Sequence, residues 1–169
     1  MELRRCSSLP TATLEFLAVH LVTEFGHLYP AWDESAATNE LSQDTAEGLP
    51  LHLAAIENHR ALGSASIIPD DEVTGWEGYD WWLANVFVLP EYRGRGIGSS
   101  LIKRAIEIAR ESGARDLHLV TDTVENWYLK QGWESIGFGD VHGHEMVVMH
   151  LELSIAQRAN SKIWPPNLL

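Results

Sequence analysis

The sequence predicts a single-domain α/β fold with a mixed central β-sheet flanked by helices. Two apolar stretches joined by a short polar turn, over 51–68, indicate a β-hairpin. An almost wholly apolar stretch at 81–89 indicates a central strand, because a strand covered on both faces loses polar alternation. Helical and extended patterns then alternate up to residue 153, which is typical of a sheet that includes parallel strands. The length of 169 residues fits one domain.

Two helices are predicted before the hairpin. Apolar residues recur at helical spacing over 13–29, beginning at Leu14. Thr11 or Thr13 is placed to cap this helix, and Pro30 lies just past its end. A second, short helix is predicted over 35–43.

The strands of the hairpin are predicted over 51–57 and 61–68, with a turn at 57–59. A loop rich in Asp, Glu and Gly follows over 69–78. The central strand ends at Pro90, which lacks the N–H group that a sheet ladder needs.

The clearest helix is predicted over 96–112, where an apolar stripe begins at Ile97 and continues at helical spacing. Gly113 suits its C-terminal cap. The remaining elements are, in order, a strand over 117–121, a short helix over 123–131 closed by Gly132, and two strands, the second over 145–153. The predicted domain therefore covers 1–153, and 154–169 forms a C-terminal tail.

The charge of the chain bounds its partners. Twenty-four Asp and Glu against 12 Lys and Arg give a formal charge of −12. Such a field repels nucleic-acid backbones and anionic membranes, so we expect neither as a partner, and an anionic ligand needs a local exception. The single cysteine, Cys6, excludes an internal disulfide framework. No apolar stretch approaches membrane-spanning length, and no export signal follows Arg4-Arg5, so we expect a cytoplasmic protein.

A glycine-rich turn joins the central strand to the clearest helix, and it reads Arg93-Gly94-Arg95-Gly96-Ile97-Gly98-Ser99. Helix starts leave amide N–H groups unpaired and attract anions, and glycines let the backbone approach phosphate oxygens closely. A Walker A loop needs a lysine that is missing here. The dinucleotide fingerprint fails as well, because its third glycine would fall on Ser99 or Leu101.

The pattern that remains, Arg-x-x-Gly-x-Gly, resembles the acetyl-CoA-binding motif of the GNAT family, the Gcn5-related N-acetyltransferases. The apolar strand and Pro90 before the turn match that family too. The resemblance implies a GNAT-like fold, with acetyl-CoA as co-substrate bound by residues 93–99. Local charge agrees, because between residues 92 and 110 Glu107 is the one acid among the bases Arg93, Arg95, Lys103, Arg104 and Arg110. Arg93 and Arg95 lie in the turn itself and are the better candidates for phosphate contacts.

A second motif reads Asn126-Trp127-Tyr128-Leu129-Lys130-Gln131-Gly132-Trp133. It resembles the family's short helix beside the pantetheine arm, whose tyrosine protonates the departing thiolate. Tyr128 matches that tyrosine. The family also has an Asn here that touches the cofactor. Asn126 is the candidate, although it stands closer to Tyr128 than the family spacing has it.

The resemblance implies direct transfer, with neither a metal nor a covalent enzyme intermediate. An amine must lose a proton before it attacks the thioester, and the carbonyl oxygen then needs a fixed N–H donor. In the family this donor is a backbone amide of the strand before the glycine turn, where that strand splays from its neighbour. Val86, Phe87 and Val88 occupy that stretch here.

The general base stays open at this point. Some family members carry a Glu on the central strand, but the strand here has no carboxylate inside it. The alternatives are a water-mediated base or one of the side chains near the strand or before the last strand: Tyr79, Asp80, His118, His142 and His144. We expect a loop or substrate-pocket role rather than metal binding for the two last histidines, because no third ligand is identifiable.

Two further groups are candidates for the acceptor side. Acidic residues cluster before the central strand, and either attract a cationic substrate or form a solvated loop: Asp70, Asp71, Glu72, Glu77 and Asp80. Four tryptophans line an acceptor pocket or pack in the core: Trp32, Trp76, Trp81 and Trp82.

The sequence therefore predicts an N-acetyltransferase that moves acetyl from acetyl-CoA to a primary amine, of a small molecule or a peptide. One alternative is a non-catalytic acyl-CoA-binding module of the same fold. Another is an enzyme that uses a longer acyl-CoA. The resemblance allows a homodimer, and the sequence does not identify the acceptor.

Overall fold

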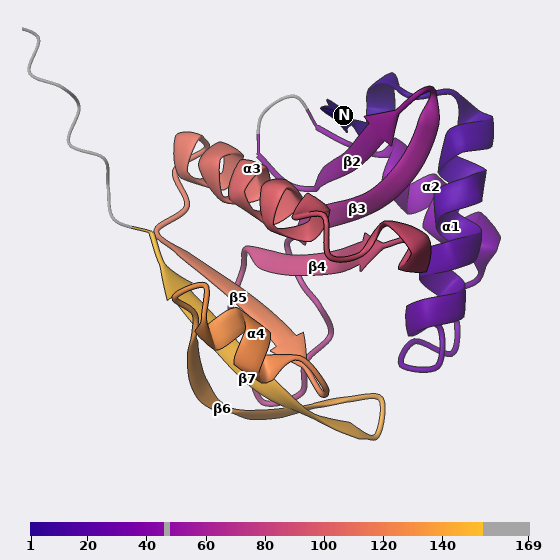
Figure 1. Cartoon of the computed structure of the whole chain (residues 1–169). Helices are drawn as coiled ribbons and strands as arrows, with labels where there is room; N and C mark the ends of the chain where they lie inside the picture. Colours follow the sequence, from indigo (N-terminus) through magenta and orange to yellow (C-terminus); the bar gives the residue numbers. More distant parts are fainter. Residues whose placement is uncertain (46–47, 154–169) are drawn as a thin grey trace, which may run out of the picture.

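A computed structural model describes residues 1–45 and 48–153 of the chain, in which helices cover a seven-stranded mixed sheet (Figure 1). The strands are β1 (Glu2–Arg5), β2 (Leu51–Glu57), β3 (Arg60–Ile68), β4 (Trp82–Val88), β5 (Asp116–Thr121), β6 (Glu134–Val141) and β7 (His144–Glu152). The helices are α1 (Thr11–Phe25), α2 (Glu34–Ser42), α3 (Ile97–Glu111) and α4 (Glu125–Leu129), with short 3-10 turns η1 (Cys6–Ser8) and η2 (Pro90–Tyr92).

The sheet has the order β1-β2-β3-β4-β5-β7-β6. All neighbouring pairs are antiparallel except β4 and β5, which are parallel and connected through α3. This arrangement confirms the predicted mixed sheet. The strand at 82–88 reads as apolar because its side chains pack against α3 on one face and α1 on the other.

Helices cover the two faces of the sheet. On one face, the α3 side chains Leu101, Ile102 and Ala105 share a buried cluster with Leu53 of β2 and Leu117 of β5. On the other face, α1 and α2 bury their apolar stripes against β2–β4. Figure 1 shows α1 and α2 together on one side of the sheet and α3 on the other. The central strand is therefore reachable only along its ends and edges.

The structure changes some predicted boundaries. Helix α1 begins at Thr11 after Pro10, and no side chain caps it, so neither predicted threonine cap forms. The same helix ends at Phe25, and Leu28 beyond it is still buried, 6% exposed, in a separate cluster. The helical spacing of apolar residues extends past the end of α1 because Leu28, in the loop after the helix, also packs in the core.

Strand β1 was not predicted. Its residues do not alternate in polarity, and its backbone pairs with β2 from Glu2 opposite Ile56 to Arg5 opposite Leu53. The free backbone N–H and C=O groups along the edge of β2 can pair with a neighbouring segment of almost any sequence, so the side chains of β1 give no signal. The predicted tail at 154–169 lies outside the described residues. Among the described helices, none is both long and apolar enough to cross a membrane.

Candidate active site

The site begins where β4 and β5 part. The two parallel strands are paired only through Trp82 opposite His118, and toward their C-terminal ends they diverge (Figure 1). On its other side β4 carries a bulge, where the register against β3 shifts between Ser64 and Ser66. Asn85 adopts a φ of 54° there. A bulge bends the strand and changes the direction of its backbone groups, here next to the gap between β4 and β5.

Hydrogen-bond alternation shows which amides face that opening. The N–H of Leu89 donates to the carbonyl of Leu62 at 2.9 Å, and Phe87 lies opposite Ser64 on β3. Because successive N–H groups along a strand point to opposite sides, the N–H of Val88 points toward β5 and that of Phe87 toward β3. Among the three predicted oxyanion donors, Val88 therefore has the suitable direction. Val86 lies within the bulge, next to Asn85, and is half-buried.

The glycine-rich turn leads directly into α3. Gly94 and Gly96 both have a φ of 76°, a left-handed conformation that glycine adopts without strain. Gly96 is the N-cap and supplies no side chain, and a Cβ there would meet no atom within 4 Å. The N–H groups of Ile97, Gly98 and Ser99 thus have no side-chain cap and begin a 15-residue helix. Uncapped N–H groups at a helix N-terminus are suited to binding an anion.

The two arginines of the turn lie at the surface and are paired with acids. Arg93 donates its Nε–H to the carbonyl of Val88 at 2.9 Å and lies 3.6 Å from Glu24. Arg95 lies 3.1 Å from Glu57 and over the ring of Tyr92. Such exposed pairs are weak, so both guanidinium groups are available to a phosphate.

A groove continues from the turn between α3 and the segment after α4. It is lined by Ser99, Ile102, Lys103, Ile106, Glu107, Arg110, Gln131 and Trp133. Of these, Trp133 is 2% exposed, and neither its Nε1–H nor the buried Nε–H of Arg110 has a hydrogen-bond partner among residues 1–45 and 48–153. Of the predicted basic island, Lys103 and Arg110 thus line the groove, whereas Arg104 pairs with Glu107. Asn126 is exposed on α4.

Tyr128 comes from α4, on the same face of the sheet as α3. It is 7% exposed and makes edge contacts with the rings of Trp127 and Trp133. Its hydroxyl forms no hydrogen bond with any residue that the structure describes. Burial raises the pKa of Tyr128 to about 12, so the phenol keeps its proton at neutral pH. It is therefore suited to be a proton donor.

On the opposite face, a chain of polar side chains runs into the bulge. The Asn85 amide donates to Glu40 at 2.9 Å and to the Ser66 hydroxyl at 3.3 Å. The second oxygen of Glu40 accepts the Trp32 indole N–H at 2.8 Å. Burial raises the pKa of the Glu40 carboxyl, and these two hydrogen bonds oppose that shift. Glu40 is a carboxylate beside the central strand that comes from α2, and sequence reasoning missed it.

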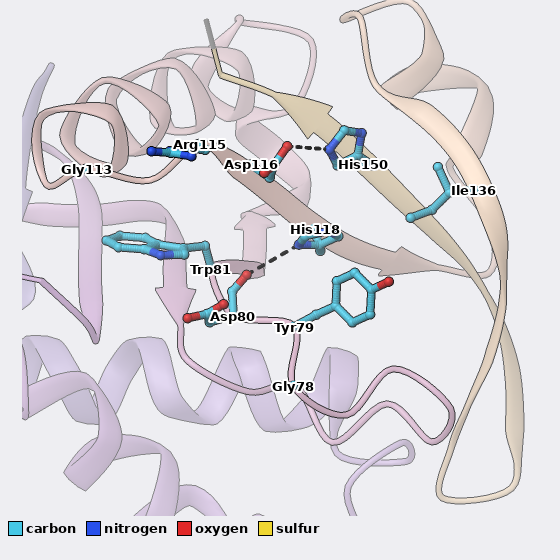
Figure 2. A pocket seen from close by; sticks show the side chains of 10 residues that line it. All are labelled: Gly78, Tyr79, Asp80, Trp81, Gly113, Arg115, Asp116, His118, Ile136 and His150. Carbon is cyan, nitrogen blue, oxygen red and sulfur yellow. Dashed lines mark hydrogen bonds and ion pairs between the residues drawn. The ribbon is translucent and has the colours of Figure 1, made fainter. Parts of the chain in front are cut away.

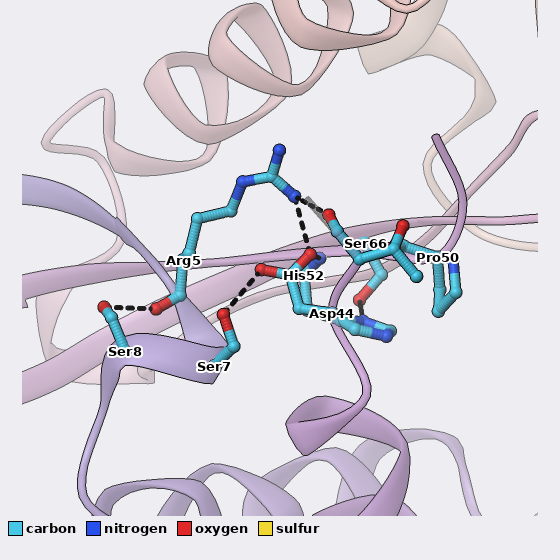
Figure 3. Close-up of polar contacts among 8 residues, drawn as sticks. Arg5, Ser7, Ser8, Asp44, Pro50, His52 and Ser66 are labelled. Carbon is cyan, nitrogen blue, oxygen red and sulfur yellow. Dashed lines mark hydrogen bonds and ion pairs between the residues drawn. The ribbon is translucent and has the colours of Figure 1, made fainter. Parts of the chain in front are cut away.

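This series of polar contacts continues from Ser66 to the β1 edge of the sheet (Figure 3). Ser66 contacts the Nδ1 of His52 at 2.8 Å, and Asp44, after α2, contacts Arg5 at 2.6 Å. His52 is fully buried, and burial lowers its pKa to about 4, so it is neutral. These contacts tie β1, β2, β3 and α2 together behind Asn85.

A buried carboxylate, Asp71, lies near the half-buried Glu40. Asp71, in the loop after β3, is 7% exposed and accepts the Tyr29 hydroxyl at 2.8 Å. Burial raises the pKa of Asp71 from 3.8 to about 7, and Glu40 adds to the shift. Of the predicted acidic cluster, only Asp71 is buried. The others are exposed: Asp70, Glu72, Glu77 and Asp80.

A separate groove holds three of the predicted base candidates. Tyr79, Asp80 and His118 line it together with Asp116 and His150 (Figure 2). Figure 2 shows the two histidines side by side, with His150 Nε2 at 2.7 Å from Asp116. His118 is also the residue opposite Trp82, so the groove lies at the closed end of the β4–β5 pair. Asn85 is three residues along β4, or ~10 Å away at strand spacing.

The β6–β7 turn holds the other two candidates. His142 lies in the turn with a φ of 47° and contacts Glu72 at 2.6 Å, and His144 is the first residue of β7, beside His27. The two histidines therefore do not share one strand face, as the i, i+2 spacing had allowed. Among residues 1–45 and 48–153, no group of three or more ligand side chains is arranged to hold a metal ion.

The four tryptophans have different roles. Trp32 binds Glu40, and Trp76 binds the Phe138 carbonyl at 2.9 Å and packs over Gly137 of β6. Trp82 is a core residue, 1% exposed, and Trp81 lines the groove at the closed end. Of these four tryptophans, Trp32 is thus the one that donates a hydrogen bond to Glu40, the carboxylate that contacts Asn85.

Comparison with known proteins identifies this arrangement. Residues 14–133 match the sequence profile of the acetyltransferase (GNAT) family. The chain belongs to the GNAT family. The match covers most of the described residues and includes the glycine turn, the diverging strands and Tyr128.

Individual relatives of this GNAT chain are similar over short stretches. Thialysine N-epsilon-acetyltransferase from Bos taurus is 46% identical over 44 residues, and the same enzyme from Mus musculus is 39% identical over 44 residues. Each match spans 26% of this chain and 26% of the relative. The matched part is therefore about a quarter of those enzymes.

Solved structures share the fold over nearly the whole chain. An aminoglycoside 6'-N-acetyltransferase complexed with coenzyme A has a TM-score of 0.65 at 16% identity, and covers 90% of this chain and 97% of its own. The PaiA N-acetyltransferase from Thermoplasma acidophilum, in complex with coenzyme A, has a TM-score of 0.67 at 16% identity, with 90% and 98% coverage. Ribosomal-protein-alanine N-acetyltransferase from Brucella melitensis has a TM-score of 0.64 at 22% identity, with 90% and 100% coverage. These identities establish the fold.

Proposed function

We propose that this GNAT chain is an N-acetyltransferase that moves the acetyl group of acetyl-CoA directly to a primary amine, with both substrates bound at once. The observation that carries the proposal is the parting of β4 and β5 beside the open N-terminus of α3. The Val88 N–H, which points toward β5, and the N–H groups at the start of α3 are separated along the chain only by the turn at 89–96. A pantetheine arm with a pyrophosphate at one end has the matching chemistry.

The residues that bind acetyl-CoA follow from these directions. The N–H groups at the start of α3 receive the pyrophosphate, and Arg93 and Arg95 exchange their surface acids for phosphate oxygens. Lys103 in the adjacent groove adds a third positive charge. The N–H of Val88 donates to the thioester carbonyl and stabilises the oxyanion that forms there.

The proposed transfer then balances as follows. The acceptor ammonium first loses one proton to a base, and its nitrogen lone pair attacks the thioester carbonyl carbon. As the oxyanion collapses, the C–N bond is kept and the C–S bond breaks. Tyr128 donates its proton to the departing thiolate. The nitrogen of the new amide then loses its second proton, and this proton returns to the Tyr128 oxygen directly or through water. One proton per turnover is released to solvent.

The curated relatives support the acceptor class. The matched thialysine N-epsilon-acetyltransferases are named for acetylation of a side-chain amine. The acidity of this chain, −12 overall, also suits a cationic substrate better than nucleic acid or an anionic membrane. A cytoplasmic location and a homodimer remain predictions.

Two measurements test the proposal on the full chain. Calorimetry with CoA is expected to show saturable binding, and the absence of heat up to about 1 mM CoA would contradict it. Incubation with acetyl-CoA and a panel of amines is expected to release free CoA thiol and to give an acetylated amine by mass spectrometry. Binding of CoA without any amine product would instead favour the non-catalytic acyl-CoA-binding module, and product only with longer acyl-CoA would change the donor.

A further inference from the structure

Two carboxylates near each other lack a cation: the half-buried Glu40 of α2 and the buried Asp71 of the loop after β3. Glu40 is hydrogen-bonded only to the neutral donors Trp32 and Asn85, and Asp71 only to the neutral Tyr29. No lysine or arginine pairs with either carboxylate within the part of the chain that the structure describes. Burying a carboxylate without a counter-ion is costly, so such groups are normally paired.

Asp71 has an oxygen that is still free. Its Oδ1 accepts the Tyr29 hydroxyl at 2.8 Å, and its Oδ2 accepts no hydrogen bond from the described residues. Among the described residues, the fully buried side-chain N and O atoms without a hydrogen-bond partner belong to His52, Arg110 and Trp133. No atom of Asp71 is among them. Asp71 as a whole is nevertheless buried, with 7% of its surface exposed. Its Oδ2 is thus an acceptor without a hydrogen-bond partner among the described residues.

The surroundings favour a positive charge at that oxygen. Asp70 and Glu72 flank Asp71 in the loop, and Glu40 faces it from α2. His142, from the β6–β7 turn, contacts Glu72 and the ring of Tyr29. The fields of Glu40, Asp70 and Glu72 all raise the pKa of the Asp71 carboxyl, and a bound cation would reverse this effect.

We propose that Asp71 binds the acceptor as an ammonium ion through Oδ2 and takes its first proton. This inference rests on the proposed acetyl transfer and names its acceptor class: aliphatic primary amines, which are cations at neutral pH. Aromatic amines and alcohols are neutral there and leave the two carboxylates without a counter-ion. Glu40 holds the Asn85 side of the same space and adds to the negative field.

The proton step is simple to balance. The ammonium N–H donates to Asp71 Oδ2, the proton passes to the carboxylate, and the neutral amine keeps the lone pair that attacks the thioester. The protonated Asp71 then returns its proton to solvent. Because burial places the pKa of Asp71 at about 7, the carboxyl can both accept and release a proton at neutral pH.

Calorimetry tests the binding step without turnover. The full chain, saturated with CoA, is titrated with butylammonium chloride or with 1-butanol. Wild-type protein is expected to bind butylammonium and not 1-butanol, and to release protons at pH 7, seen as heats that differ between two buffers. Asp71→Asn is expected to weaken butylammonium binding about tenfold or more and to abolish the buffer dependence.

The neighbouring residue supplies a matched control. Asp70→Asn removes the same charge one position away, at an exposed side chain whose Oδ1 accepts the Glu72 N–H at 2.9 Å, and asparagine keeps that acceptor. We expect near wild-type affinity for butylammonium. Equal losses in Asp70→Asn and Asp71→Asn would overturn the proposal, because the effect would then be long-range charge only. Unchanged affinity in Asp71→Asn would overturn it as well.

A pH profile gives an independent readout once an amine substrate is found. The Tyr29 hydrogen bond lowers the pKa of Asp71, so Tyr29→Phe is expected to move the acidic limb of kcat/KM to higher pH. A limb that stays in place would contradict the role of Asp71 as the base. Failure of CoA binding in wild-type protein would instead refute the proposed function, which the calorimetry with CoA alone reveals separately.

Discussion

At the scale of single residues, proton transfer is set by burial. Tyr128 is enclosed by aromatic neighbours, which keeps its phenol protonated, whereas Asp71 is a buried carboxyl whose pKa of about 7 lets it exchange protons. In the proposed mechanism, burial therefore makes Tyr128 a proton donor and Asp71 a proton acceptor.

Tyr128→Phe tests the acid. We expect kcat to fall by about tenfold to a hundredfold, because the thiolate must then take its proton from water, while the KM for acetyl-CoA changes little. Steady-state kinetics with the best amine of the panel measures both. Tyr92→Phe is the matched control, since it removes a hydroxyl but keeps the ring that Arg95 covers. A wild-type kcat in Tyr128→Phe would remove this residue from the mechanism.

At the scale of elements, the start of α3 and the bulge of β4 place the backbone groups of the site. Neither depends on a particular reactive side chain. The helix supplies free N–H groups because its N-cap is Gly96, and the bulge turns the strand because Asn85 adopts a left-handed conformation. Substitutions that alter backbone geometry or charge should therefore act strongly here.

Gly96→Asp places a negative charge at the N-terminus of α3, where the pyrophosphate is expected. We expect CoA affinity to fall more than about a hundredfold, measured by calorimetry, because repulsion adds to the loss of the free amides. Gly113→Asp is the control, because it introduces the same side chain at another positive φ, 96°, past the other end of this helix. Equal CoA affinities in the two variants would show that the turn does not bind phosphate.

Asn85 combines a strained backbone with the link to Glu40. Asn85→Gly is expected to keep the bulge and lose the side-chain contacts, whereas Asn85→Val also introduces a β-branched residue at a φ of 54°. The valine variant should therefore be less stable than the glycine variant by about 1–2 kcal/mol in denaturant unfolding. If the two were equally stable, the conformation of Asn85 would not be the feature that holds the bulge.

At the scale of the whole molecule, a chain with a net charge of −12 contains a basic segment at 93–110, and in the proposed reaction the two charges suit different substrates. The basic turn and α3 suit the anionic co-substrate, and the acidic loop with α2 suits a cationic acceptor. The sheet separates them, so that each substrate meets a field of opposite sign.

The acidic site should make stability depend on pH. The Asp71 carboxyl has a pKa of about 7 in the folded chain against an ordinary 3.8, so between these values the folded state holds a proton that the unfolded state has lost. The free energy of unfolding therefore falls as pH rises through this window. Asp71→Asn lacks this term, and its Tm relative to wild type should be higher at pH 8 than at pH 5.

Thermal unfolding of both proteins at the two pH values measures this effect. Each kcal/mol corresponds to roughly 2–4 °C in a chain of this size. Asp70→Asn serves again as the control, because its side chain is exposed. A Tm difference for Asp71→Asn that is the same at both pH values would contradict the raised pKa.

Local patterns were sufficient to predict much of this fold. The hairpin, the central strand and α3 follow from hydrophobic periodicity, and the glycine turn follows from spacing. Strand β1 escaped prediction because its backbone pairing with β2 leaves no side-chain pattern. The end of α1 was misplaced because Leu28 packs from outside the helix and continues its spacing.

The sequence by itself determined the family resemblance, the place of the anion site at 93–99 and Tyr128 as the candidate acid, because these depend on residues adjacent in the chain. Only the tertiary structure brings together the carboxylates of the proposed acceptor site. Glu40 and Asp71 are 31 positions apart in the sequence, yet the folded chain places Glu40 close enough to raise the pKa of Asp71. A carboxylate becomes a base through burial and neighbouring charge, and both are properties of packing rather than of sequence spacing.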